Sequence, residues 1–265
     1  MSFECDGKRV LVTGASSGIG AGLAEAFAAR GASVGLCARR GARLREVAAR
    51  CEAANPDGEH RMWLADLSEA HQVDRVAHGV LEAWGGVDIL VNNAGIPKRR
   101  HVTALDIETV EHVTNLNYLS AVRLTLALLP PMVERRSGLV VTLSSVGATL
   151  SSPGEAAYDA SKAALAVFSE AMAVDLWDTG VKVLVVYPGV VDTELFSIPD
   201  NDEFTAPVEK IPVSELVDGV FAALDAGRSQ VYVPAFFGEL AAGKAANVEG
   251  FLAGTAEYVR TGKVD

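Results

Sequence analysis

The sequence predicts an α/β fold in which one doubly wound parallel sheet of about seven strands carries helices on both faces. Two observations lead to this prediction. Short apolar runs rich in Val, Ile and Leu alternate with longer segments of helical periodicity, as repeated strand-helix-strand units do. The 265 residues, 49% of them hydrophobic, can bury one substantial core but are too few for two comfortable domains. We therefore expect a single domain over 1–265.

The predicted elements follow one another along the chain. Because each is a short apolar run, we expect strands at 8–14, 32–38, 61–66, 87–92, 138–144, 181–187 and 230–234. Helical patterns lie between them at 18–30, 41–54, 69–84, 103–136, 155–178 and 213–226. Gly31 and Gly180 stand just past two of these helices, where a left-handed cap costs glycine least. Right-handed crossovers would bring the carboxyl ends of all strands to one rim, where ligands bind in such sheets.

The composition limits the partners of the chain. A formal net charge of -11 gives no basic field for nucleic acid or an anionic membrane, so small molecules are the expected ligands. Cys5, Cys37 and Cys51 fit neither a disulfide framework nor a zinc site, and the five histidines lack ligand spacing, so no metal is expected. We expect a soluble, cytoplasmic protein, because Met1 to Lys8 is polar and no stretch approaches the ~20 apolar residues of a membrane span.

A glycine-rich turn follows the first predicted strand. The segment RVLVTGASSGIG runs from this strand through Gly14, Gly18 and Gly20 into a helix. Gly14 permits a tight turn, Gly18 lets backbone amides approach a pyrophosphate, and Gly20 lets helix and strand pack closely. The anion would lie at the helix amino terminus, where unpaired amides and the helix dipole favour negative charge. A glycine turn alone is weak evidence for a dinucleotide site, but its position between a strand and a helix favours one.

Six further motifs follow the glycine turn. They are Asp66 in LADLS, NNAG at 92–95, a helical asparagine, Ser145, YDASK at 158–162 and YPGVVDT at 187–193. In this order the series resembles the short-chain dehydrogenase/reductase family over about residues 8–195. The resemblance implies a Rossmann fold, with a cofactor half over about 1–150 and a substrate-contacting part over about 145–265. It also implies an oxidoreductase that transfers a hydride between a nicotinamide and a carbonyl or secondary alcohol.

The resemblance further implies which residues contact the cofactor. In the family, Asp66 would bracket the adenine, and Asn92 to Gly95 would hold the end of the fourth strand against the cofactor. Asp66 can also cap the helix before SEAHQV, and the two roles can coexist. The expected cofactor residues are Gly14, Ser16, Ser17, Gly18, Ile19, Gly20, Arg39, Asp66, Asn93, Ala94, Gly95, Tyr158, Lys162, Pro188, Gly189, Val191 and Thr193.

Tyr158 and Lys162 are predicted to form the acid/base unit. They stand four residues apart on a helix and so share a face. A tyrosine with a pKa of ~10 is a poor base at neutral pH, and the nearby Lys162 ammonium is expected to lower that pKa. The phenolate would take a proton from an alcohol, and the phenol would protonate a developing alkoxide. The resemblance assigns polarisation of the substrate oxygen to Ser145, which its spacing to Tyr158 favours over Ser144.

Asn115 and Asn117 compete for a fourth role. In the family a helical asparagine helps to hold a water between the active site and the lysine. Asn117 lies eight residues before Thr125 and twenty-four after Asn93, as the family pattern asks, whereas Asn115 misses both spacings by two. Asn117 is therefore the predicted catalytic asparagine.

The end of the second strand favours NADP(H), with NAD(H) possible. In ASVGLCARR, Ala38 stands where NAD-preferring relatives place an acid, and Arg39 follows it. An acid would repel a 2′-phosphate, whereas an arginine can pair with it. Arg39 and Arg40 could instead merely begin an exposed helix. Ser17 stands where many NADP-preferring relatives have a second basic residue, so the predicted preference is moderate.

Several segments carry weaker expectations. Lys98–Arg100 are expected in a solvated loop, with contact to an anionic substrate as the alternative. Residues 198–212, with three prolines, are expected to form an irregular loop that acts as a lid over an apolar substrate. The segment 231–242 is expected in the core rather than at an interface or pocket wall. By analogy with the family, the apolar stripe of the helix at 103–136 implies a homodimer or homotetramer.

Three functions remain in competition. An NADP(H)-dependent carbonyl reductase or alcohol dehydrogenase acting on an apolar small molecule is favoured, with an NAD(H)-preferring enzyme as its variant. A regulatory protein that binds a dinucleotide without turnover would have no need of Ser145, Tyr158 and Lys162. A dinucleotide-sugar epimerase or dehydratase generally has a much larger carboxyl-terminal region than this chain provides.

Overall fold

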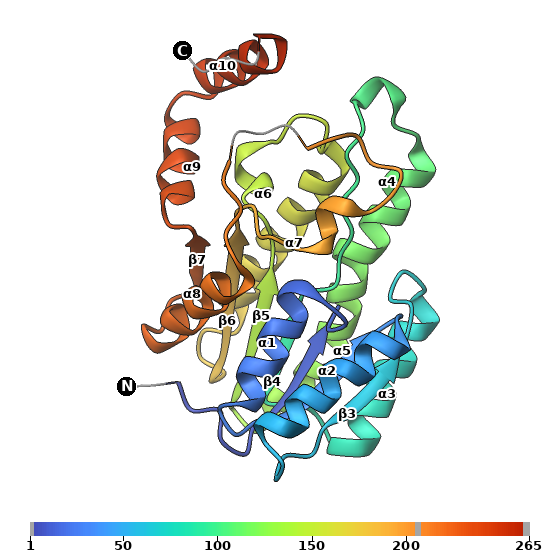
Figure 1. Cartoon of the computed structure of the whole chain (residues 1–265). Helices are drawn as coiled ribbons and strands as arrows, with labels where there is room; N and C mark the ends of the chain where they lie inside the picture. The colour runs from blue at the N-terminus through green and yellow to red at the C-terminus, as the bar shows by residue number, and fades with distance from the viewer. Residues whose placement is uncertain (1–2, 205–207, 262–265) are drawn as a thin grey trace.

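The computed structural model describes residues 3–204 and 208–261 (Figure 1). A seven-stranded parallel sheet with the order β3-β2-β1-β4-β5-β6-β7 forms its centre. The strands are β1 (Arg9–Thr13), β2 (Ser33–Ala38), β3 (Arg61–Leu64), β4 (Ile89–Asn92), β5 (Gly138–Leu143), β6 (Val181–Pro188) and β7 (Gln230–Val233). All seven predicted strands are confirmed. The chain winds outward from β1 in one direction and from β4 in the other, which makes the β1/β4 boundary the expected ligand crevice.

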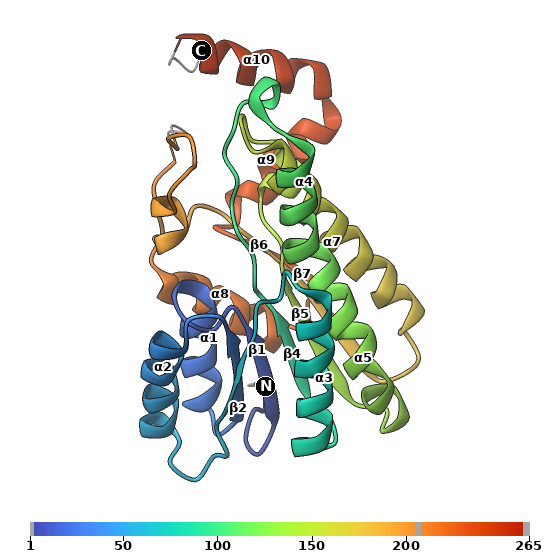
Figure 2. The same cartoon turned by 90° about the vertical axis from the view of Figure 1, so that its right-hand side faces the viewer.

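Helices cover both faces of the sheet, with α1, α2 and α8 on one side and α3, α5 and α7 on the other (Figures 1 and 2). The helices are α1 (Gly18–Ala28), α2 (Gly41–Ala54), α3 (Ala70–Trp84), α4 (Ile107–Thr114), α5 (Ser120–Glu134), α6 (Gly147–Leu150), α7 (Ala156–Asp175), α8 (Val213–Asp225), α9 (Phe236–Ala246) and α10 (Val248–Thr261). The fold is therefore the predicted doubly wound, Rossmann-like arrangement.

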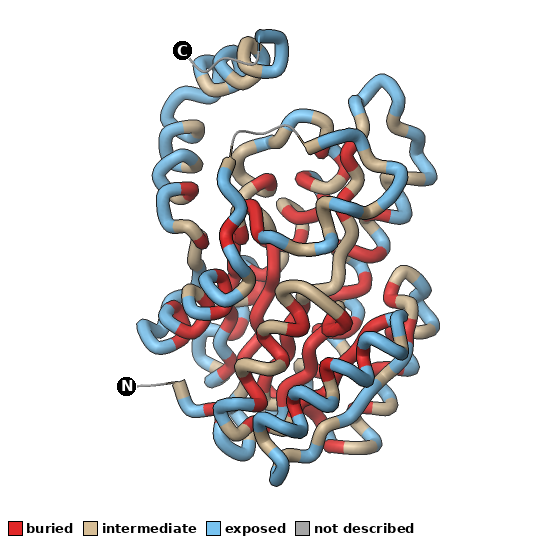
Figure 3. The backbone as a smooth tube through the Cα atoms, in the orientation of Figure 1, coloured by how far each residue is buried: buried red, intermediate tan, exposed pale blue. Residues whose placement is uncertain are grey.

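The two cores follow from the alternation of side chains along the strands. In β1, Val10 and Val12 belong to the core under α1 and α8, whereas Leu11 belongs to the core under α3 and α5. In β4, Leu90 likewise faces the core under α3 and α5. Figure 3 shows the buried residues running through the sheet, with exposed residues on the outer helices. Continuous apolar strands are what a parallel sheet covered on both faces requires.

Two predicted elements differ in the structure. The helix predicted at 103–136 is α4 and α5 joined by a π-helical turn, Asn115–Leu119. The segment 231–242 is buried only at Val233 and Phe237, and α9 exposes Phe236 and Leu240. Because Phe237 and Leu240 line a cavity, the segment is a pocket wall, the alternative to the expected core segment. Of the loop predicted at 198–212, positions 205–207 lie outside the described residues.

One stretch departs from the expectation for membrane spans. Among the described helices, Ile107–Glu134 is long and apolar enough to cross a membrane by length and composition. A core helix of a globular domain passes the same test. Here this stretch packs against α3 and α7 as part of the layer on one face of the sheet.

Candidate active site

A cavity of about 880 Å³ opens where β1, β4, β5 and β6 end. Its volume is typical of sites for small molecules and cofactors. The residues predicted for the catalytic and cofactor sites line this cavity, except Gly20, Asp66 and Asn117. Residues that are far apart in the sequence thus meet at the rim on which parallel strands present their carboxyl ends.

The glycine turn between β1 and α1 forms one wall of the cavity. Gly14 and Gly18 have φ values of +65° and +55°, a region that strains any side chain. A Cβ on Gly14 would lie 2.9 Å from the Cα of Ala94, and one on Gly18 would lie 3.0 Å from the methyl carbon of Thr193. Gly20 lies behind the turn, where a Cβ would collide with the carbonyl oxygen of Gly14. No larger residue fits these three positions without moving the turn.

Thr13 and Asn93 tie the ends of β1 and β4 together beside this turn. Thr13 Oγ1 accepts hydrogen bonds from the amides of Asn93 (2.9 Å) and Ala94 (3.0 Å), and Asn93 Nδ2 donates to the Thr13 carbonyl (2.8 Å). A Cβ on Gly95 would lie 3.3 Å from Lys162 Nζ. The NNAG segment is therefore held against both the glycine turn and the predicted catalytic lysine.

Arg39, at the end of β2, pairs with Asp66. The distance from Arg39 Nη1 to Asp66 Oδ2 is 3.3 Å, and Asp66 Oδ1 accepts from the amide and hydroxyl of Ser68. Burial would raise the pKa of Asp66, but the hydrogen bonds from Ser68 and Arg39 outweigh burial and hold the pKa below its usual value. Asp66 thus stabilises the turn before α3, and Arg39 lines the cavity beside it.

Arg40 lies over the glycine turn. Its Nη2 donates to the hydroxyls of Ser16 (3.2 Å) and Ser17 (2.5 Å), and its Nη1 pairs with Glu194 Oε2 at 2.7 Å. The hydrogen bond and charge of Arg40 lower the pKa of Glu194. The Arg40 guanidinium therefore lies beside Ser17 and places a positive charge next to this neutral residue.

The segment after β6 forms the facing wall. The Gly189 amide donates to the Val233 carbonyl at 2.8 Å, and a Cβ on Gly189 would collide with the ring of Phe237. This contact holds the segment close to β7 and α9. The predicted residues on this wall are Pro188, Gly189, Val191 and Thr193, and Ile19 lines the cavity from the start of α1.

The predicted catalytic side chains lie on α7 and at the end of β5. Ser145 Oγ accepts from the Gly147 amide at 3.1 Å, and the Ser145 side chain lies near enough to Tyr158 to lower the pKa of its phenol. Ser144 Oγ instead donates to the Lys162 carbonyl at 2.9 Å, so Ser144 is occupied with the helix backbone. Lys162 Nζ donates to the Leu143 carbonyl at 2.8 Å and lies 5.9 Å from the centre of the Tyr158 ring.

The acid/base properties of these groups differ from the sequence expectation. Burial, together with the negative charge of Glu155, raises the pKa of Tyr158, while the hydrogen bond with Ser145 lowers it by less. Burial lowers the pKa of Lys162 to about 8. In the chain alone the pKa of Tyr158 is therefore raised rather than lowered, because burial outweighs the other influences on it. In this state Tyr158 is a phenol at neutral pH.

Asn117 lies in the π-helical turn and is fully buried. Its Oδ1 accepts from the Ile96 amide at 2.8 Å, and its Nδ2 donates to the Ile96 carbonyl and to Ser161 Oγ, both at 3.0 Å. Asn115 is exposed. Asn117 thus joins the segment after β4 to α7 next to the predicted acid/base unit, and π turns of this kind occur frequently at functional sites.

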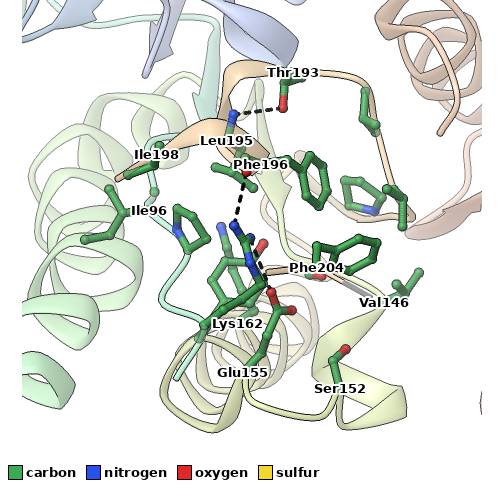
Figure 4. Close-up of a pocket in the computed structure, with 18 of the residues that line it drawn as sticks. Ile96, Val146, Ser152, Glu155, Lys162, Thr193, Leu195, Phe196, Ile198 and Phe204 are labelled. Carbon is green, nitrogen blue, oxygen red and sulfur yellow. Dashed lines mark hydrogen bonds and ion pairs between the residues drawn. The ribbon is translucent and has the colours of Figure 1, made fainter. Parts of the chain in front are cut away.

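Beyond Tyr158 the cavity continues into an apolar chamber. Figure 4 shows this chamber with Phe196, Ile198 and Phe204 on the segment after β6. The rings of Phe196 and Phe204 meet edge to face at 5.0 Å between centroids. From the carboxyl-terminal helices, Phe237, Phe251 and Val259 also line the cavity.

The loop that follows β4 closes over this chamber through polar contacts with residues 196–202. Lys98 and Arg100 each bond to Asp200, and Arg99 donates through Nε to the Asp202 carbonyl (3.0 Å) and through Nη2 to the Phe196 carbonyl (3.3 Å). Arg99 is only 4% exposed. The expectation of a solvated loop at 98–100 is therefore wrong for Arg99, which carbonyls about a hundred residues away enclose. Lys98 and Arg100 are partly exposed and pair with Asp200.

Sequence reasoning missed several residues of the cavity. Arg40, Thr13, Arg99 and Glu155 all have side chains that hold or line it. The doublet Arg39–Arg40 was a signal for Arg40, since either arginine of the pair could turn toward the glycine turn. The opposite charges of the 98–100 and 200–202 segments were a signal for Arg99. For Glu155 and for the carboxyl-terminal helices, the sequence carries no comparable motif.

Comparisons with known proteins agree with this geometry. The family model described as short chain dehydrogenase matches residues 8–203. Dehydrogenase/reductase SDR family member 7B of Mus musculus is 36% identical over 188 residues, which cover 70% of this chain and 58% of that protein. The match thus spans less than two thirds of this curated relative. A 3-oxoacyl-acyl-carrier-protein reductase, FabG of Vibrio cholerae, is 32% identical over 82% of this chain and 86% of its own length.

Solved structures give the same result. A short-chain dehydrogenase from Sphingobium yanoikuyae in complex with NADPH has a TM-score of 0.82 and 30% sequence identity, over 93% of this chain and 95% of that one. The agreement includes the seven-stranded parallel sheet and its covering helices. The sequence motifs, the family model and the fold lead to one conclusion: the chain belongs to the short-chain dehydrogenase/reductase family.

Proposed function

We propose that the protein is an NADP(H)-dependent oxidoreductase that transfers a hydride between the nicotinamide and a carbonyl or secondary alcohol of a small, largely apolar molecule. One observation carries this proposal. A single cavity runs from the glycine turn and two arginines, past Ser145 and Tyr158, into an apolar chamber. Cofactor, proton donor and substrate could therefore meet in one space.

The residues present fit a dinucleotide. Gly14, Gly18 and Gly20 form a cradle that a Cβ would fill, and α1 begins at this cradle with no side-chain cap on its first amides. Such amides and the helix dipole favour a pyrophosphate. Asn93 to Gly95 and Thr193 would hold the remainder of the cofactor from both sides. When bound, the nicotinamide supplies or accepts the hydride.

The preference for NADP(H) rests on two cations rather than one. Arg39 and Arg40 both line the cavity beside the glycine turn, and Arg40 lies against the hydroxyl of Ser17. Arg40 would thus supply the second positive charge that the sequence lacks at position 17. Two guanidinium groups favour a 2′-phosphate, and Ala38 offers no acid to hold a ribose hydroxyl. The Sphingobium relative, which was solved with NADPH, supports the same choice.

The proton chemistry would be carried by Tyr158. Its raised pKa keeps the phenol protonated, and a phenol can donate its proton to an alkoxide that forms on the substrate. Ser145, which lines the cavity beside Tyr158, would bind and polarise the same substrate oxygen. Lys162 and Asn117 would hold α7 against the segments after β4 and β5. The protonated phenol of Tyr158 favours the reduction of a carbonyl near neutral pH.

Two further properties belong to the proposal. Leu126 on α5 and Val167, Val174 and Trp177 on or beside α7 are exposed, with Trp177 82% exposed. An apolar surface of this kind supports a homodimer or homotetramer formed through these helices. The three cysteines are buried and unpaired, which supports a reducing location such as the cytoplasm.

The decisive experiment measures nicotinamide absorbance with a panel of ketones, aldehydes and secondary alcohols, each with NADP(H) and with NAD(H). We expect turnover of carbonyl compounds with NADPH and tighter binding of NADPH than of NADH in titration calorimetry. Arg39→Ala and Arg40→Ala should each weaken NADPH binding by about 10- to 100-fold, the worth of a hydrogen bond to a charged group. Arg43→Ala is the matched control, because Arg43 also pairs with Glu194 but does not line the cavity. Equal affinity for both cofactors would refute the stated preference, and no turnover of any carbonyl would refute the activity.

A further inference from the structure

Arg99 presents an unsatisfied donor in the wall of the apolar chamber. Its side chain is buried, and its Nε and Nη2 are bonded to the carbonyls of Asp202 and Phe196. Its Nη1 has no hydrogen-bond partner among residues 3–204 and 208–261 and has almost no accessible surface. The nearest acid is Glu155, whose Oε1 lies 3.7 Å from this nitrogen, an ion-pair distance too long for a hydrogen bond. Both Arg99 and Glu155 line the cavity.

An unpaired buried donor is costly. Leaving such a group without a partner costs about 1–3 kcal/mol, and more for a charged group, so native structures rarely retain one without a reason. The two bonds to backbone carbonyls prevent the guanidinium from turning toward solvent. Because Nη1 has almost no accessible surface, an acceptor that enters the cavity reaches it once a neighbouring side chain such as Glu155 shifts.

The position of this donor relates it to the reacting centre. Glu155 precedes α7 by one residue and stands three residues before Tyr158. Three residues of helix span about 4.5 Å, so the Arg99–Glu155 pair lies within the length of a small molecule from the Tyr158 region. A substrate oxygen at Tyr158 and a second polar group at Arg99 can belong to one molecule.

The surroundings decide the charge of that second group. Glu155 already supplies a negative charge beside Arg99, and Phe196, Ile198 and Phe204 supply an apolar wall. Burial already raises the pKa of Glu155, and a substrate carboxylate would raise it further, because the two acids would share one guanidinium. An uncharged acceptor, such as the carbonyl of a ketone, ester or amide, satisfies Nη1 without this repulsion.

We propose that Arg99 is a specificity-determining residue that donates a hydrogen bond to a second, uncharged carbonyl on the substrate. The preferred substrates are then dicarbonyl compounds with an apolar remainder, one carbonyl reacting at Tyr158 and the other bound by Arg99. This inference rests on the proposed function and deepens it by naming the substrate class.

The test compares reduction of four probes of equal chain length with NADPH: 2-heptanone, 2,3-heptanedione, 2,4-heptanedione and the anion 2-oxoheptanoate. We expect kcat/KM for at least one dione to exceed that for 2-heptanone by about 10- to 100-fold, as a hydrogen bond to a charged donor would give. The oxo acid should be no better than 2-heptanone. Glu155→Gln should raise the relative kcat/KM of the oxo acid, because it removes the opposing charge.

Variants assign the preference to Arg99. Arg99→Met should reduce the dione preference to about one while leaving NADPH affinity unchanged, and Arg99→Lys, which keeps a donor, should retain part of it. Arg100→Met is the matched control, since Arg100 also donates to a backbone carbonyl of the same segment, that of Asp200, but does not line the cavity. It should leave the preference intact.

The outcomes separate this inference from the proposed function. Reduction of 2-heptanone and the diones at equal efficiency by the unmodified protein would overturn the role of Arg99 even if Arg99→Met failed to fold. A preference for 2-oxoheptanoate would overturn it in favour of an anion site. A dione preference that survives in Arg99→Met would also overturn it. Failure of every probe to consume NADPH would instead refute the proposed activity.

Discussion

Asp159 provides a quantitative test of the electrostatics around the active site. It follows Tyr158 on α7 and is 7% exposed. One carboxylate oxygen is bonded to the Ser152 amide at 2.5 Å, and the other, Oδ1, has no hydrogen-bond partner in the part of the chain that the structure describes. Burial raises its pKa from 3.8 to about 7, the charge of Glu155 adds to this rise, and the Ser152 amide and Lys244 oppose it. The perturbation is Asp159→Asn, which has the size of the neutral carboxyl but cannot titrate.

The sign and size of the effect follow from proton linkage. Because the pKa is raised in the folded protein, the neutral form of Asp159 contributes stability that is fully present below pH 3.8 and lost as pH rises through about 7. Two pH units within this window correspond to about 2–3 kcal/mol. For a chain of 265 residues, this amounts to roughly 4–5 °C in melting temperature. Asp159→Asn avoids the loss, so its stability relative to the unmodified protein should grow by this amount from pH 5 to pH 8 and then remain constant.

Melting temperatures by differential scanning fluorimetry or calorimetry from pH 5 to pH 9 measure this difference directly. A difference for Asp159→Asn that is constant from pH 5 to pH 9 would refute the raised pKa. A difference that falls with rising pH would mean that the carboxylate is stabilised in the fold.

Three further predictions concern the catalytic unit and the glycine turn. Tyr158→Phe should reduce turnover by at least ~10²-fold with NADPH affinity retained in calorimetry, and near-normal turnover would exclude Tyr158 as the acid/base. Lys162→Met should abolish activity yet raise the melting temperature at pH 7, because it removes a buried ammonium whose pKa is lowered to about 8. This gain in melting temperature should shrink as pH rises above 8, where the lysine of the unmodified protein loses its charge. A gain that stays constant with pH would contradict the lowered pKa. The Cβ of Gly20→Ala would collide with Gly14, so this variant should lose about 1–3 kcal/mol in the free energy of unfolding, measured by chemical denaturation, and bind NADPH more weakly. Gly243→Ala, in open space on α9, is the control and should stabilise the protein slightly.

The sheet and the residues at its strand ends could be predicted because their signals are local. Each buried strand is an apolar run, and the glycine turn and the pair Tyr158 and Lys162 have short, characteristic spacings. Parallel topology then brings strand ends together without any further information. The order β3-β2-β1-β4-β5-β6-β7 is the one expected for a doubly wound parallel sheet.

The substrate end could not be predicted, because its residues are defined by contacts across the chain. Arg99 reads as a solvated cation until the carbonyls of Phe196 and Asp202, about a hundred residues away, enclose it. The sequence singled out Arg39, but the geometry of the turn after β2 brings Arg40 to Ser17. The helices α9 and α10 bury few side chains, so their apolar pattern was weak.

Contacts across the chain also determine how Lys162 acts on Tyr158. A spacing of four residues places two side chains on one face of a helix, but it does not determine where a flexible lysine points. The carbonyl of Leu143, at the end of β5, accepts the hydrogen bond from Lys162 Nζ, and burial then lowers the pKa of the ammonium. Charge tuning between neighbours on a helix therefore depends on the strand against which the helix packs.

Glu155 connects the proposed substrate specificity to the proposed direction of reaction. Its carboxylate lies beside Arg99 and, on the same side of α7, acts on Tyr158, whose pKa it raises. The charge that would exclude anionic substrates therefore also favours the phenol, the form that donates a proton to a developing alkoxide. Occupation of Arg99 by an uncharged carbonyl leaves this negative charge in place, whereas a bound carboxylate would compete with it for the guanidinium. For a neutral dicarbonyl substrate, binding at Arg99 and proton donation by Tyr158 are thus both compatible with a negative charge on Glu155.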